Sequence, residues 1–140
     1  MATLFTRIIK GEVPGRFVWR DDQCVAFLSI QPLRPGHVLV VPRAEIDHWV
    51  DLDPALAQHL FAVAQSLAKA LQDGFRSKRV GLAIAGLEVP HCHIHVVPIN
   101  VIRDLDFANQ DQHPRPEDLD QAAQTIRTAL RRLGFTEVAD

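Results

Sequence analysis

Cysteine is scarce in this sequence, and long hydrophobic runs are absent. Only two of the 140 residues are cysteines, Cys24 and Cys92, and each lies in an apolar segment without Cys-x-x-Cys spacing. Such cysteines are typical of reduced core thiols in a cytoplasmic protein and not of a disulfide framework. No stretch approaches the roughly 20 apolar residues that cross a bilayer, and residues 1–11 include Arg7 and Lys10. We therefore expect neither a membrane span nor a signal peptide.

The sequence also lacks a large excess of charge of either sign. Its net charge is −2, and its 15 lysines and arginines are scattered and form no basic stripe. Nucleic acid and anionic membranes are therefore not expected as partners. The chain has the length of one domain, residues 1–140, and is too short for a TIM barrel, which needs about 250 residues.

The hydrophobic pattern predicts five strands and three helices. Apolar, β-prone runs predict strands at Phe17–Arg20, Cys24–Ile30, His37–Val41, Val80–Ala85 and Cys92–Val97. Helical spacing predicts a short helix over Leu4–Ile9, a long one from Asp53-Pro54 to a C′ glycine at Gly74, and a C-terminal one over about 116–134. The polar segment Arg103–Pro116 is interpreted as a mobile or partner-contacting loop, or as a plain linker. This order favours an α+β domain in which a long central helix and a C-terminal helix cover an antiparallel sheet.

Three histidines alternate with apolar residues in one of the predicted strands. On a strand, His91, His93 and His95 share one face, because side chains alternate with a period of two. Packing explains such an array poorly, since every buried ring nitrogen needs a partner, although chance exposure on a polar face stays open. The array suits either metal ligation or phosphoryl chemistry, in which one imidazole attacks phosphorus. Histidines about 6.5–7 Å apart along one strand rarely converge on a single ion without another ligand.

The same segment resembles the signature of the histidine-triad (HIT) family. Residues 85–98 read Ala-Gly-Leu-Glu-Val-Pro-His-Cys-His-Ile-His-Val-Val-Pro, in which histidine and apolar positions alternate after Ala-Gly. The resemblance continues upstream through residues 4–14, 25–32 and 35–42, in the family's order and spacing. It covers about 3–105 and implies a single HIT-like domain with a helical extension at about 116–134.

The resemblance implies an enzyme that cleaves at the α-phosphate of a nucleotide derivative. The family includes hydrolases and nucleotidyl transferases that act on nucleoside phosphoramidates, aminoacyl adenylates or dinucleoside polyphosphates through a nucleotidyl-histidine intermediate. It implies that His93 is the nucleophile, that His95 contacts a non-bridging oxygen and that His91 supports the leaving-group side. His37 matches a fourth histidine in the hydrogen-bond network behind the triad. A neutral imidazole is a competent nucleophile near pH 7. No cofactor and no catalytic metal is implied.

The family also implies a site for a purine nucleotide such as AMP. Apolar residues would form the slot for the base, Ser29 would face the ribose hydroxyls, and two residues before the triad would lie near the phosphate. These candidate substrate-binding residues are Phe5, Ile8, Phe27, Ser29, Ile30, Glu88 and Val89. Relatives are commonly homodimers, so the resemblance also implies a homodimer.

Several positions depart from the family pattern. Ser29 replaces a common aspartate, and Val80, Leu87 and Glu88 replace polar residues that contact phosphate or the leaving group in relatives. These changes leave open a nucleotide-binding or scaffold protein with little turnover. A metalloprotein built on the three histidines is a third, weaker alternative.

Two further features of the family, a structural zinc and the dimer contacts, involve residues outside the triad. Some bacterial relatives hold a structural zinc with an N-terminal Cys-x-x-Cys and further histidines. Here no cysteine precedes Cys24, and Glu45 stands at a histidine position, so no structural zinc is expected. For His48 and Trp49, a surface or dimer-contact role is expected and not metal ligation.

Overall fold

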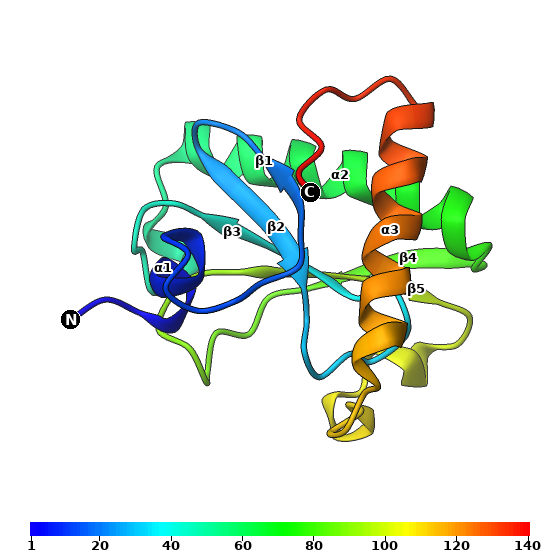
Figure 1. Cartoon of the computed structure of the whole chain (residues 1–140). Coiled ribbons are helices and arrows are strands. Elements are labelled where there is room, and N and C mark those ends of the chain that lie inside the picture. The colour runs from blue at the N-terminus through cyan, green and yellow to red at the C-terminus, as the bar shows by residue number, and fades with distance from the viewer.

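Five strands form one antiparallel sheet in the order β1-β2-β3-β5-β4 in the computed structural model, which describes residues 1–140 (Figure 1). The strands are β1 (Phe17–Arg20), β2 (Cys24–Leu28), β3 (Val38–Pro42), β4 (Arg79–Ala83) and β5 (Ile94–Ile99). The helices are α1 (Leu4–Ile9), α2 (Pro54–Phe75) and α3 (Pro116–Arg132). Short 3-10 turns form η1 (Trp49–Asp51), η2 (Ile102–Leu105) and η3 (Phe107–Asn109). The predicted α+β class is confirmed.

The two faces of the sheet carry separate cores. Along β2, Ala26 and Leu28 point into the larger core, which lies under α2 and α3, whereas Val25 and Phe27 point to the opposite face. There they join a smaller cluster that includes Phe5 of α1. Because both faces are covered in this part of the sheet, the central strands are apolar along their whole length. In Figure 1, α2 crosses behind the sheet, α3 stands at its right, and α1 lies at the left near the N-terminus.

The long helix begins as predicted but ends differently. The Asp53 side chain accepts a hydrogen bond from the Ala55 N–H at 3.0 Å, and Pro54 occupies the first turn. The helix runs past Gly74, and the residue in the left-handed conformation is Arg76, with φ of 52°. The expected C′ role of Gly74 is therefore wrong. A Cβ at Gly74 would lie 2.9 Å from the Thr125 side chain, so this glycine permits close packing of α2 against α3.

None of the helices has both the length and the apolar character that are needed to cross a bilayer.

Candidate active site

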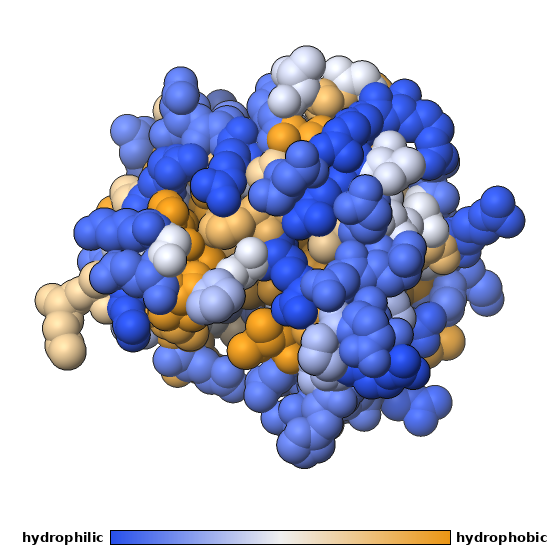
Figure 2. Space-filling model, viewed as in Figure 1, coloured by the Kyte–Doolittle hydropathy of each residue, from blue (hydrophilic) through white to orange (hydrophobic).

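A cavity of about 240 Å³ opens between α1, the end of β2 and the segment that precedes β5. We call it the apolar cavity. Phe5 and Phe27 meet edge to face inside its wall, with ring centroids 5.5 Å apart. Figure 2 shows hydrophobic residues gathered over and beside α1. The candidates that line the cavity are Phe5, Ile8, Phe27, Ser29, Ile30, Glu88, Val89, His93 and His95. The structure thus brings all seven candidate substrate-binding residues and two candidate catalytic histidines to one place.

His93 lies immediately before β5, which begins at Ile94. Its Nδ1 is 2.8 Å from the backbone carbonyl oxygen of His91. A carbonyl can only accept, so Nδ1 carries the proton and Nε2 keeps its lone pair. Burial lowers the pKa of His93, although the bond to the His91 carbonyl opposes this shift. The ring is therefore neutral near pH 7, with a free Nε2.

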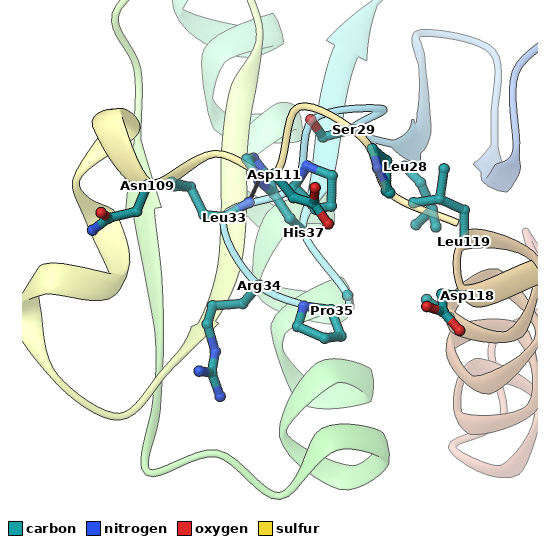
Figure 3. A pocket seen from close by; sticks show the side chains of 14 residues that line it. Leu28, Ser29, Leu33, Arg34, Pro35, His37, Asn109, Asp111, Asp118 and Leu119 are labelled. Carbon is teal, nitrogen blue, oxygen red and sulfur yellow. Dashed lines mark hydrogen bonds between the residues drawn. The ribbon is translucent and has the colours of Figure 1, made fainter. Parts of the chain in front are cut away.

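A chain of hydrogen bonds fixes the orientation of His95. The Leu33 N–H donates to Nδ1 of His37 at 2.9 Å, so the proton of His37 is on Nε2. That Nε2 lies 2.9 Å from Nδ1 of His95, which must accept. The remaining proton of His95 is therefore on Nε2, where it can be donated to a ligand. Figure 3 shows the turn that carries Leu33 and His37.

The His37–His95 pair is uncharged near pH 7. Burial, followed by the nearby His95 and His93, lowers the pKa of His37 to about 3. Burial and the neighbouring His93 lower the pKa of His95 to about 4. A neutral imidazole has one donor nitrogen and one acceptor nitrogen. Because Nδ1 of His95 accepts from His37, Nε2 of His95 is its donor.

His91 does not reach the cavity. It is fully buried, its Nε2 lies 2.7 Å from the Pro42 carbonyl oxygen, and its Nδ1 lies 2.7 Å from the Thr3 hydroxyl. Both ring nitrogens are therefore occupied inside the protein. The role on the leaving-group side that the resemblance implied has no counterpart in this geometry. The segment around His91 is not a strand, so the alternation expected from the sequence does not apply to it. His91 instead supports His93 through its carbonyl.

The three triad imidazoles do not form a shared metal site. The one group of three histidine, cysteine or acidic side chains whose ligand atoms lie within 4.8 Å of one another is Asp21, Cys24 and His59, at the β1–β2 turn and α2. In the triad, internal hydrogen bonds occupy both nitrogens of His91 and Nδ1 of each of the other two rings. This arrangement argues against the metalloprotein alternative.

The polar segment 103–116 contributes to the site, which the sequence did not predict. The Phe107 ring packs on His95 with centroids 4.8 Å apart, and Gln110 lines the apolar cavity. The segment is held in place because the Asp111 N–H donates to the Pro32 carbonyl at 3.0 Å. Figure 3 shows Asn109 and Asp111 beside the turn that carries His37. An aromatic residue within this polar stretch was the available signal.

The fold and site together define an α+β protein in which two neutral histidines, His93 and His95, line an apolar cavity. Residues 10–101 match the HIT domain, and the chain belongs to the HIT family. It is 31% identical over 137 residues to Protein hit of Bacillus subtilis, covering 91% of this chain and 93% of that protein.

Two solved structures are similar. A zinc-bound histidine triad family protein from Mycobacterium smegmatis is 27% identical, with a TM-score of 0.82 over 95% of this chain and 96% of its own. A HIT family hydrolase from Legionella pneumophila is 28% identical, with a TM-score of 0.59 over 69% of this chain and 91% of its own. Membership of the family supports a nucleotide-binding function of the hydrolase or transferase kind.

The residues around the start of α1 do not fit a structural zinc. Thr3 and Thr6 supply hydroxyls there, and the Thr3 N–H donates to Oε1 of Glu45 at 2.8 Å. Hydrogen bonds from Thr6 and from Thr3 hold the pKa of Glu45 below its usual range. Structural zinc is bound mainly by thiolates and imidazoles, and the one imidazole here, His91, has both nitrogens engaged. These side chains satisfy one another and tie α1 to the histidine segment.

Proposed function

We propose that this protein cleaves nucleotide derivatives at the α-phosphorus, with Nε2 of His93 as the nucleophile. The observation that carries the proposal is the 2.8 Å hydrogen bond between Nδ1 of His93 and the His91 carbonyl. This bond leaves the lone pair on the nitrogen that is free to react. Family membership supports the same kind of chemistry.

The reaction would proceed in two steps. In the first, Nε2 of His93 forms a bond to phosphorus while the bond to the leaving group breaks, and the leaving nitrogen or oxygen keeps the electron pair and takes up a proton from solvent. In the second, water attacks phosphorus, loses a proton to solvent and releases the nucleotide with a neutral imidazole. The Nε2–H of His95 would donate to a non-bridging oxygen and stabilise charge that develops there.

A purine nucleoside is the group that fits the cavity beside these histidines. The rings of Phe5 and Phe27 offer apolar faces and edges to a base. Ser29 would face the ribose, but its Oγ already accepts a hydrogen bond from the Gln31 N–H at 3.2 Å. We expect weaker ribose binding than an aspartate would give, because a hydroxyl offers less acceptor capacity than a carboxylate.

The test is turnover of an adenosine 5′-phosphoramidate labelled at phosphorus. We expect His93→Ala to lose turnover while it still binds AMP, and His113→Ala, which removes an exposed histidine outside the cavity, to match the parent. Equal rates for His93→Ala and the parent would refute the proposal. Binding of AMP without turnover by the parent, over a panel of phosphoramidates and polyphosphates, would instead favour a nucleotide-binding protein.

We further propose a homodimer that uses the β4 edge of the sheet. Strand β4 is terminal in the sheet, and Leu82 is 40% exposed. Nearby, Trp49, Ile84 and Leu87 line a hollow of about 230 Å³. An exposed apolar edge strand is a common site of association between copies of a chain.

A further inference from the structure

A second hollow of about 220 Å³ adjoins the apolar cavity at His93 and His95. The two spaces share His93, His95, Glu88 and Gln110. The remaining residues of the second hollow are Ala85, Gly86, Leu87 and Phe107. A substrate whose base occupies the apolar cavity and whose phosphorus lies beside His93 would place its leaving group in this second space. We call it the leaving-group hollow.

The lining of both spaces carries negative charge and no lysine or arginine. Glu88 is the one charged residue in both. The field of Glu88 reaches the nucleophile, because it raises the pKa of His93 against the larger lowering by burial. His95 is neutral near pH 7, since its pKa is about 4. The site therefore offers hydrogen-bond donors to one phosphate group but no fixed positive charge to a longer anion.

We propose that Glu88 is a specificity-determining residue that selects substrates with a cationic leaving group over substrates with a polyphosphate leaving group. The inference rests on the proposed function. A polyphosphate would bring several negative charges next to the Glu88 carboxylate without a compensating cation. An amine that carries an ammonium group on an alkyl stem would pair its charge with Glu88. Its stem would lie along the Phe107 ring.

The expected size of the effect follows from the position of Glu88. The residue is exposed, so solvent screens its charge. Exposed ion pairs contribute about 0.2–1 kcal/mol, which corresponds to up to about fivefold for each unit of charge. The preference should weaken as salt is raised.

Three adenosine 5′-phosphoramidates of equal length provide the test. Their substituents on nitrogen are 4-aminobutyl, which is cationic, pentyl, which is neutral, and 3-carboxypropyl, which is anionic. Diadenosine tetraphosphate is the fourth substrate. The enzymes are the parent, Glu88→Gln, and Asp22→Asn as a control that removes an exposed carboxylate outside both cavities. We measure kcat/KM at low and moderate salt, and the affinity of each compound for His93→Ala by calorimetry.

In the parent and in Asp22→Asn, we expect kcat/KM to decrease from the cationic to the neutral to the anionic phosphoramidate. Diadenosine tetraphosphate should have the lowest value. In Glu88→Gln, the kcat/KM values of the three phosphoramidates should differ by less than about twofold. An unchanged order in Glu88→Gln, or a parent that is indifferent to charge or prefers tetraphosphate, would overturn the proposal. If no compound turns over, the proposed function fails, but the charge order in the affinities for His93→Ala still decides the role of Glu88. Equal affinities of His93→Ala for the cationic, neutral and anionic compounds would refute the role of Glu88 in specificity.

Discussion

His37 is a buried residue whose two hydrogen bonds should support both stability and catalysis. In His37→Leu, the Leu33 N–H loses its acceptor and Nδ1 of His95 loses its donor. Each buried polar group left without a partner costs about 1–3 kcal/mol, so we expect the free energy of unfolding to fall by about 2–6 kcal/mol. Leucine is similar to histidine in volume, so a cavity adds little to this cost.

The same substitution should change the tautomer of His95. Without the donor from His37, Nδ1 of His95 can carry the proton, and Nε2 then no longer donates to the phosphate. Loss of one preorganised donor to a developing oxyanion costs about 10²–10³ in rate. The rate scales with the fraction of His95 that keeps its proton on Nε2, so a fraction of about 1–10% gives a single-turnover rate about 10- to 100-fold lower.

The matched control is His37→Gln, whose amide can both accept from Leu33 and donate to His95. Urea denaturation gives the free energy of unfolding, and single-turnover kinetics on the labelled phosphoramidate give the rate. We expect His37→Gln to recover more of the rate than of the stability. If His37→Leu keeps both the stability and the rate of the parent, the proposed hydrogen-bond chain is wrong.

Three further results are expected. Thr3→Val removes the donor to Nδ1 of His91, so it should lower the free energy of unfolding by about 1–3 kcal/mol and slow turnover. Thr3→Ser keeps a hydroxyl and should restore both. Equal stability and turnover of the two variants would contradict this prediction. Because the pKa values of His37 and His95 are lowered to about 3 and 4, the unfolded chain binds more protons below about pH 6.5. Urea denaturation should therefore show stability that is complete above that pH and falls by up to about 1.4 kcal/mol per pH unit for each histidine as pH drops towards 4. A flat profile in the parent, or the same slope in His37→Leu, would show that these residues do not control it. Finally, Leu82→Lys at the β4 edge should convert a dimer to monomers in analytical ultracentrifugation, and a monomeric parent would refute the proposed dimer.

The fold was largely predictable from the sequence because its signals are local. Alternating and continuous apolar runs gave the strands, and Asp53-Pro54 gave the start of α2. The predicted end of that helix was wrong because Gly74 is needed for close packing against Thr125 of α3 and not for a helix cap. Helix-capping patterns in the sequence do not reveal such a tertiary contact.

The candidate site was predictable in composition but not in its internal arrangement. The spacing of His93 and His95 and the family pattern pointed to residues that line one cavity. The position of His91 was not predictable, because its ring is fixed by Thr3 and Pro42, which are distant in sequence. The contact of Phe107 with His95 was missed for the same reason.

Peptide mapping by mass spectrometry of protein quenched during turnover tests the central claim most directly. After digestion, the account predicts that the peptide containing His93 gains the mass of one AMP group, and that this adduct is acid-labile and disappears as substrate is exhausted. The adduct should be absent in His93→Ala. An adduct on another residue, or turnover with no covalent adduct on His93 at any quench time, would contradict the account.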